Sequence, residues 1–412
     1  MKIRKLTDVK NLKNKRVLVR VDFNVPIKDG IVKDIYKIEK TLPTIQYLIK
    51  KGAQVILVSH LGRPNGVDKS LSLDPIVKVL EKLLGASVIL SKAKDLDFST
   101  MFANARSAQN DNKIILLENI RFYPGEEKND PKFAKQLASI ADIFVLDGFA
   151  VAHRASASIT GVAKYLPAYA GLLLAEEIEG LSRVLNKPKT PLIVIIGGVK
   201  CETKIPVLNN FLKKASYILV GGGIFSTYLW AKGNKIGASL VDKDFKKEIL
   251  KICANKKIIL PVDVVVGKKD GSGARIVNCH PERSPKGGVE GSRFFDSLRS
   301  LAMTGGEAIY DVGPRTVQLF AKYIKRANTL VMNGALGYFE QSPYQHGTYA
   351  ISRLFASRSK GKAFGVAGGG ETVQILQKLG IIDNVDLVST GGGAMLEFLG
   401  GKKLPGVKTV EI

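Results

Sequence analysis

The chain has 412 residues, of which 24% are charged and 45% hydrophobic, a balance that excludes disordered, collagen-like and disulfide-rich proteins. Its 62 lysines and arginines outnumber its 37 acidic residues, giving a net charge of +25 that suits nucleic acid, anionic metabolites or only a lysine-rich surface. The basic residues are scattered rather than gathered in one block with aromatic residues, so we expect no nucleic-acid partner.

The sequence gives no sign of a membrane or an oxidising compartment. No uncharged apolar run reaches the ~18–20 residues that a membrane span needs, and the N-terminus lacks the apolar core of a signal peptide. The three cysteines, Cys201, Cys253 and Cys279, are an odd number that fits reduced thiols. We therefore expect a cytoplasmic protein with no membrane partner.

Short apolar segments recur along the chain, separated by helical stretches. These segments are 16–23, 54–60, 114–119, 142–148, 191–198, 217–223, 258–266, 329–334, 363–370 and 386–393. They are apolar at nearly every position and rich in β-branched residues, which is typical of strands buried on both faces of a parallel sheet. The helices expected between them include 73–84, 131–140, 205–214 and 315–328. The alternation predicts an α/β protein with doubly wound parallel sheets.

A helix expected over 172–190 divides the chain, with similar numbers of strands on each side. We interpret it as an interdomain helix between an N-terminal domain, 1–171, and a C-terminal domain, 191–390. The alternative is a crossover helix inside one large sheet, which so many strands would strain. Residues 267–306, rich in glycine, serine and arginine, interrupt the pattern as a long excursion with at most one short helix near 294–301.

Glycine-rich turns follow the apolar segments of the second half, each just before an expected helix. They are GGVK (197–200), GGG (221–223), GGGET (368–372) and STGGGA (389–394). Helix N-termini at the carboxyl ends of parallel strands bind phosphates, and glycine lets the backbone approach them. The pattern predicts a nucleotide site, although the common Walker A and dinucleotide-binding glycine motifs are absent. Glu371 is the best candidate to approach a Mg²⁺ ion carried by the nucleotide.

The first half places arginine and histidine at the corresponding strand ends. The candidates are Arg20, Asp22, Asn24, His60, Arg63, Arg121, His153 and Arg154. Arginine forks bind carboxylates and phosphates through paired hydrogen bonds, so a small, multiply charged acid is the expected ligand. Neither a nucleophile motif nor a zinc-binding spacing is present. The residues alone thus indicate a two-domain enzyme that transfers a group directly between a nucleotide and a small anion.

The order of the motifs resembles phosphoglycerate kinase, an archaeal-like member, over nearly the whole chain. The motifs are RVDFNVP (20–26), LPTI (42–45), SHLGRP (59–64), LENIRFYPGEE (117–127), DGFAVAHRASAS (147–158), GGVKCETKI (197–205), NGALGYFE (333–340), GGGET (368–372) and STGGGAMLEFLGGKKLPGV (389–407). The resemblance implies two Rossmann-like domains hinged at the central helix, with a tail, 391–412, returning to the first domain. It implies reversible transfer of a phosphoryl group from 1,3-bisphosphoglycerate to MgADP, giving 3-phosphoglycerate and MgATP directly and in line after hinge closure. The chain would be a monomer or homodimer.

The resemblance also assigns roles to residues. Asp22, Phe23, Asn24, His60, Leu61, Gly62, Arg63, Arg121, His153 and Arg154 would bind the phosphoglycerate. Lys204, Gly221, Gly222, Gly223, Gly313, Glu340, Gly369, Gly370, Glu371 and Thr372 would bind ATP or ADP, with Glu371 facing Mg²⁺. Lys37, Lys200, Lys204, Gly391, Gly392 and Gly393 would be catalytic.

One departure from the family bears on catalysis. The family has arginine where this chain has Lys37, six residues before Pro43, and lysine keeps the charge but loses the fork. We expect a reduced or retuned rate. Two alternatives stay open: a phosphoglycerate kinase fold kept as a binding or regulatory protein, and a kinase acting on another carboxylate or on carbamate.

Overall fold

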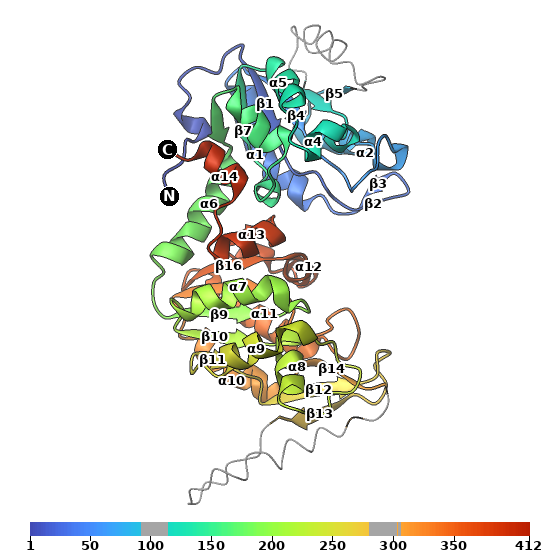
Figure 1. Ribbon diagram of the computed structural model, residues 1–412, viewed down its shortest axis with the longest axis vertical. Helices are drawn as coiled ribbons and strands as arrows, with labels where there is room; N and C mark the ends of the chain where they lie inside the picture. The colour runs from blue at the N-terminus through green and yellow to red at the C-terminus, as the bar shows by residue number, and fades with distance from the viewer. Residues whose placement is uncertain (92–113, 280–302, 304–305) are drawn as a thin grey trace, which may run out of the picture. The chain divides into compact units, whose positions relative to one another are not determined.

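The computed structural model describes residues 1–91, 114–279, 303 and 306–412 (Figure 1). They form two compact units, Met1–Glu179 with Lys403–Ile412, and Gly180–Lys402. The division falls inside helix α6 (Leu172–Asn186), so the chain leaves the first unit along this helix. Each unit contains a six-stranded parallel sheet, which confirms the predicted α/β class.

The sheet of the first unit has the order β5-β6-β4-β1-β7-β8. Its strands are β1 (Arg16–Arg20), β4 (Gln54–Val58), β5 (Val88–Ser91), β6 (Ile114–Leu117), β7 (Ile143–Leu146) and β8 (Ala168–Ala170). The other elements are the hairpin β2 (Ile27–Lys28) and β3 (Ile31–Val32), and the helices α1 (Tyr36–Lys50), α2 (Asp74–Leu84), α4 (Pro124–Glu127), α5 (Pro131–Ser139) and α14 (Pro405–Val410). β1 pairs with β4 on one side and β7 on the other, and its buried residues join the core of this unit.

Local sequence signals set the ends of the helices in this unit. α5 begins where the Asp130 side chain accepts a hydrogen bond from the Phe133 amide at 2.8 Å, with Pro131 in the first turn. α2 ends at Gly85, which adopts the left-handed conformation with φ of 62°. α14 lies beside the N-terminal segment (Figure 1), because the Arg4 amide donates to the Val410 carbonyl at 2.8 Å.

The parallel sheet of the second unit has the order β11-β10-β9-β15-β16-β17. Its strands are β9 (Leu192–Ile196), β10 (Tyr217–Val220), β11 (Ile258–Ile259), β15 (Thr329–Asn333), β16 (Phe364–Gly368) and β17 (Leu387–Ser389). The helices are α7 (Cys201–Leu212), α8 (Gly222–Ala231), α9 (Lys246–Cys253), α10 (Pro314–Ile324), α11 (His346–Ser359), α12 (Gly370–Lys378) and α13 (Gly392–Leu399). Every residue of the apolar strand β9 is buried, as expected for a strand covered on both faces.

The structure corrects two expectations about this half. The segment 258–266 is not one strand: β11 joins the parallel sheet, whereas β12 (Asp263–Gly267) pairs antiparallel with β13 (Arg275–Asn278) and β14 (Ala308–Val312). Pro261, which has no amide hydrogen, lies at the break. β13 therefore occupies part of the predicted excursion, and the short helix expected near 294–301 lies outside the described residues. The alternative of one large sheet is wrong, since the parallel strands form two separate sheets.

Candidate active site

The first unit collects charged side chains beyond the carboxyl ends of β1 and β4. Arg20 and Val58 are paired in the two strands, so Asp22 and His60, each two residues further on, lie together. Asp22 Oδ1 is 3.7 Å from His60 Nδ1. Lys37, in the first turn of α1, donates from Nζ to Asp22 Oδ2 at 2.7 Å. Lys37, which stands where the family has arginine, thus contacts the Asp22 carboxylate.

A second group of contacts joins the same site. The Gly62 amide donates to Asn24 Oδ1 at 3.0 Å, and the Arg121 guanidinium donates to the Gly62 carbonyl. Arg121 Nε is also 3.2 Å from a Glu127 carboxylate oxygen. Arg63 is exposed, and its charge acts on Arg121, which places it near that side chain. These residues form a cationic cluster at the carboxyl ends of β1 and β4.

Other predicted residues of the first unit have different surroundings. The side chains of Phe23 and Leu61 are buried in the hydrophobic core, so they anchor the loops rather than offer polar groups to a ligand. Arg154 is half-buried, and its charge lowers the pKa of both His60 and Arg121, so it lies close to them. His153 is half-buried beside it in sequence.

Burial and charge shift the pKa values in this cationic cluster. Burial acts to raise the pKa of Asp22, but nearby positive charge, with that of Lys37 the largest contribution, outweighs it, so the pKa falls below its ordinary value. Burial, followed by the charge of Arg20, holds the pKa of His60 well below 6.5. Asp22 is therefore a carboxylate, and His60 is a neutral imidazole at neutral pH.

The second unit brings Lys204 and the GGGET turn to the carboxyl ends of three neighbouring strands. Lys204, on α7 after β9, is 7% exposed and donates to Asn333 Oδ1 at the end of β15. Asn333 Nδ2 donates in turn to the Gly368 carbonyl at 2.8 Å, at the end of β16. Burial lowers the pKa of Lys204 to about 8, against the opposing effect of Glu371.

The turn after β16 is held from the side of β15. Thr372 Oγ1 accepts from the Gly334 amide at 2.8 Å, and Glu371 Oε2 accepts from the Ala335 amide at 3.1 Å. Gly369 has a φ of 97°, a conformation that glycine adopts without strain. The N-terminus of α13 packs against it, since a Cβ on Gly392 would lie 2.9 Å from the Gly369 Cα. The predicted glycine turns 368–372 and 389–394 thus meet at one place.

A cavity of about 620 Å³ adjoins these turns, within the range of small-molecule sites. Its lining residues are Gly198, Val199, Gly222, Gly223, Ser226, Ala238, Leu240, Lys269, Gly306, Ala308, Ile309, Tyr310, Ala335, Leu336, Gly337, Tyr338, Phe339, Glu340 and Glu371. Of these, Gly222, Gly223, Glu340 and Glu371 were predicted from the sequence. Glu371 and Gly198 both line the cavity, and a Cβ on Gly198 would lie 3.5 Å from Glu371 Oε2 and 3.5 Å from Lys204 Cε. The remaining wall is mostly apolar or aromatic.

Several predicted nucleotide or catalytic residues lie outside this lining. Lys200 is exposed at the N-cap of α7, and Gly391 is at the N-cap of α13. Gly221 precedes α8, and Gly393 lies in the first turn of α13. Gly313 caps α10, where the space of a Cβ is filled by the Asp263 carboxylate. That glycine is thus explained by packing.

Sequence reasoning missed Asn333 and most of the aromatic and apolar cavity wall. Asn333 stands within NGALGYFE, which was recognised only as a motif, and its partner Lys204 is 129 positions away. Lys269 lies in the excursion that matched no motif. Tyr310 is on the unpredicted strand β14, which carries no long apolar run.

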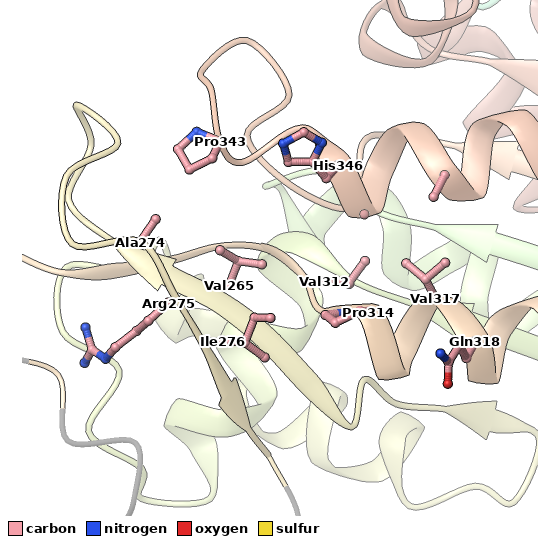
Figure 2. Close-up of a pocket in the computed structure, with 12 residues that line it drawn as sticks. Val265, Ala274, Arg275, Ile276, Val312, Pro314, Val317, Gln318, Pro343 and His346 are labelled. Atoms are coloured by element: carbon pink, nitrogen blue, oxygen red, sulfur yellow. The ribbon is translucent and has the colours of Figure 1, made fainter.

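A second cavity of about 570 Å³ lies between the antiparallel sheet and the helices α10 and α11 (Figure 2). Val265 and Ile276 come from β12 and β13, Val317 from α10 and His346 from the start of α11. None of the residues predicted for the site lines this cavity. The predicted residues that line a cavity, Gly222, Gly223, Glu340 and Glu371, all line the first one.

The remaining observations concern metals, thiols and membranes. Among residues 1–91, 114–279, 303 and 306–412, no cluster of three metal-ligating side chains occurs. All three cysteines are buried, and burial raises the pKa of Cys253 and of Cys279 to about 12. No described helix is long and apolar enough to cross a bilayer.

Comparison with known proteins decides the family. The profile of the phosphoglycerate kinase family matches residues 6–402. This chain belongs to the phosphoglycerate kinase family. It is 44% identical over 402 residues to the phosphoglycerate kinase of Moorella thermoacetica, with 96% of each chain covered. It is 43% identical over 408 residues to that of Dictyoglomus turgidum, covering 97% of this chain and 96% of the relative.

Solved structures agree. Phosphoglycerate kinase from Coxiella burnetii superposes with a TM-score of 0.81 at 38% identity, covering 99% of this chain and 98% of the other. The enzyme from Pyrococcus horikoshii gives 0.80 at 30% identity with the same coverage. These full-length relatives confirm the predicted function: the protein is a phosphoglycerate kinase, a phosphotransferase with a carboxyl group as acceptor. The archaeal-like character expected from the sequence is not established by these matches.

Proposed function

We propose that the cationic cluster of the first unit binds 3-phosphoglycerate and 1,3-bisphosphoglycerate. Arg63, Arg121 and Arg154 supply the cationic groups, Asn24 supplies an amide, and His60 supplies a neutral donor. The observation that supports this assignment is the surplus of buried or half-buried cations, since Arg121 has a pKa lowered by burial and by the charge of Arg154. A substrate with a carboxylate and one or two phosphates would relieve that repulsion.

The cavity of the second unit is proposed to bind ATP or ADP. Its volume of about 620 Å³ and its apolar far wall suit a purine and a ribose, with Glu340 near the ribose hydroxyls. The phosphates would lie toward Lys204 and the turns at Gly369, Gly370 and Thr372. The N-termini of α12 and α13 begin at these turns and offer free amides to anionic oxygens.

Glu371 fits a Mg²⁺ ion carried by the nucleotide. It lines the cavity, and its carboxylate accepts from the Ala335 amide at 3.1 Å. Mg²⁺ binds through one or two carboxylates together with substrate phosphates, so a full protein cage is not needed. When bound, the ion would neutralise charge on the phosphate oxygens.

The chemistry needs positioning and charge rather than a base. The acceptor is a carboxylate, which is ionised at neutral pH and needs no proton removed. Lys37 would provide charge to the phosphoryl group in flight, with Lys200, Lys204 and the amides of Gly391 to Gly393 contributing from the nucleotide side. We propose that transfer is direct and in line, after closure of a hinge at the helix over 172–190.

The proposal extends to organisation and location. We propose functional domains over 1–171 and 191–390; of the tail 391–412, the residues Lys403–Ile412 belong to the first unit. We place it in the cytoplasm as a monomer or homodimer, with no nucleic-acid partner.

Turnover of Lys37 variants tests the assigned mechanism. Consumption of ATP on adding 3-phosphoglycerate is read through glyceraldehyde-3-phosphate dehydrogenase and NADH, for wild type, Lys37→Arg and Lys37→Ala. We expect Lys37→Ala to lose about 100-fold in kcat, because one charge on the transferring group is removed, and Lys37→Arg to match or exceed wild type. Lys40→Ala, an exposed position on the same helix, is the control. If Lys37→Ala turns over like Lys40→Ala, Lys37 has no catalytic role.

A further inference from the structure

Arg20 stands out because it is the largest fully buried side chain of the described residues, and the family resemblance gave it no role. Its guanidinium contacts the Ser158 hydroxyl, the carbonyls of Val21 and Val58, and the ring of His60. In the described part of the chain it forms no direct ion pair with a carboxylate. Burial lowers the pKa of Arg20, and the charges of Glu126 and Asp22 act against that shift. A fully buried cation is costly unless its hydrogen bonds are satisfied, so the partners of this guanidinium fix its position.

The hydrogen bonds around Arg20 have a defined direction. The Ser158 hydroxyl has one proton, which it donates to Glu126 Oε1 at 2.6 Å. It therefore accepts from Arg20 Nε, at 2.8 Å. The Ser158 amide also donates to Glu126 Oε2 at 2.8 Å, and Ser156 donates to Oε1 at 2.7 Å. Glu126 thus anchors Ser158, and Ser158 anchors the fork of Arg20.

We propose that Arg20 is a positioning residue that holds His60 as the neutral tautomer with its proton on Nε2. Arg20 Nη2 is 3.3 Å from His60 Nδ1, and a guanidinium can only donate, so Nδ1 accepts. The competing partner, Asp22 Oδ1, is 3.7 Å from the same nitrogen, beyond hydrogen-bond distance. A neutral imidazole that accepts at Nδ1 carries its hydrogen at Nε2.

The charges that face His60 favour the same state. Arg20, Arg121 and Arg154 oppose a positive ring, and Asp22 alone favours one. Burial adds to the opposition, so the pKa of His60 lies well below its ordinary value. Asp22 is itself paired with Lys37 at 2.7 Å, which reduces its pull on the ring. Under the proposed function, on which this consequence rests, Nε2–H is a fixed donor to an anionic oxygen of the phosphoglycerate.

Nitrogen NMR of the free enzyme tests the tautomer without any substrate. Histidine is labelled with ¹⁵N at both ring nitrogens, and the His60 signals are assigned by their loss in His60→Gln; the chain has 4 histidines. We expect an unprotonated Nδ1 and a protonated Nε2, unchanged between pH 5.5 and 8. A proton on Nδ1, or a charged ring at pH 7, would overturn the proposal.

A matched pair of variants tests the role of Arg20 without removing its buried charge. Ser158→Ala deletes the acceptor of Arg20 Nε, whereas Ser156→Ala deletes the other hydroxyl bonded to Glu126 and leaves Arg20 untouched. We expect mixed tautomers of His60 in Ser158→Ala and the wild-type spectrum in Ser156→Ala. Equal effects of the two variants on the His60 spectrum would contradict the positioning role.

Kinetics provide a readout that a merely structural role would not give. In Ser158→Ala we expect the KM for 3-phosphoglycerate to rise about fivefold at pH 7.5 with kcat nearly unchanged, because a ground-state donor is lost. At pH 6 the KM should return toward wild type, since a freed His60 becomes protonated and binds the anion again. If the NMR spectra are as expected but the KM does not change, Arg20 still sets the tautomer of His60, and His60 does not contact the substrate. The spectra therefore test the positioning role of Arg20, whereas the KM tests the proposed substrate contact.

Discussion

Replacing Lys204 with methionine should make the protein more stable and much less active. Burial lowers the pKa of Lys204 from 10.5 to about 8, and each pKa unit corresponds to about 1.4 kcal/mol. The charged ammonium therefore costs the folded protein about 3 kcal/mol at pH 7. Methionine removes that cost but leaves Asn333 Oδ1 without its donor, a loss of about 1 kcal/mol. We expect Lys204→Met to raise the free energy of unfolding by about 2 kcal/mol, and to lower kcat about 100-fold.

The pH dependence of this difference identifies its cause. Between pH 8 and 10.5 the unfolded chain keeps the lysine proton while the folded protein has lost it. Because the unfolded state then binds more protons, the wild-type contribution from this group rises with pH. The advantage of Lys204→Met should thus be largest at pH 7 and should shrink as the pH approaches 10.

Urea unfolding of the free enzyme at pH 7, 8.5 and 9.5 measures this difference. Lys200→Met is the matched control, because Lys200 is exposed at the start of the same helix and its replacement should leave stability nearly unchanged. The reasoning is refuted if Lys204→Met is less stable than wild type at pH 7, or if the difference between them does not change with pH.

Two further predictions concern the core of the first unit and the glycine turns. Asp147 accepts from the amides of Leu173 and Leu174 at the start of α6, and burial raises its pKa from 3.8 to about 8. Above pH 3.8 the unfolded chain loses this proton while the folded protein keeps it, so stability from this group is lost as the pH rises toward 8; Asp147→Asn should match wild type at pH 4 and exceed it by a growing margin up to pH 8 in urea unfolding. Gly392→Ala should weaken ATP binding about tenfold in calorimetry, because its Cβ would lie 2.9 Å from backbone, whereas Gly393→Ala, with open space around it, should bind normally; equal affinities would exclude this packing argument.

Most strands of the parallel sheets could be predicted because they are apolar at nearly every position, whereas the short edge strands β5 and β8 were not predicted. RVLVR and LIVII are buried on both faces, so sequence and environment agree. The antiparallel sheet was not predicted, because β14 has the sequence AIYDV, which contains a buried aspartate. Only tertiary contacts explain that aspartate, since Asp311 accepts from the amides of Gly347 and Thr348 at 2.7 and 3.2 Å. The residues next to Asp311 in the sequence do not predict those hydrogen-bond partners.

The site residues also divide into those whose place follows from the strand pattern and those whose place depends on contacts distant in the sequence. Asp22 and His60 follow adjacent parallel strands, so the strand-end rule alone brings them together. Gly313 follows a strand and precedes a helix, as a phosphate-binding glycine does, yet the contact that requires it is with Asp263, 50 positions earlier. Arg20 looked like one more strand-end arginine, and its direction toward His60 depends on Ser158, which is 138 positions away. Sequence spacing locates residues at a sheet edge, but it does not reveal which side chains hold others in place.

The net charge of +25 does not distinguish exposed cations from the buried cations of the two candidate sites. In the first unit burial lowers the pKa of Arg20 and Arg121, and in the second it lowers the pKa of Lys204. Each of these cations is held in a setting that disfavours its charge, and a bound anion removes part of that penalty. The scattered exposed lysines lack this property, because water and salt already screen them. Under the proposed function, affinity for the substrates would arise from the desolvated cations that contact them, Arg121 and Lys204, while the surface charge would act on the rate at which anions arrive.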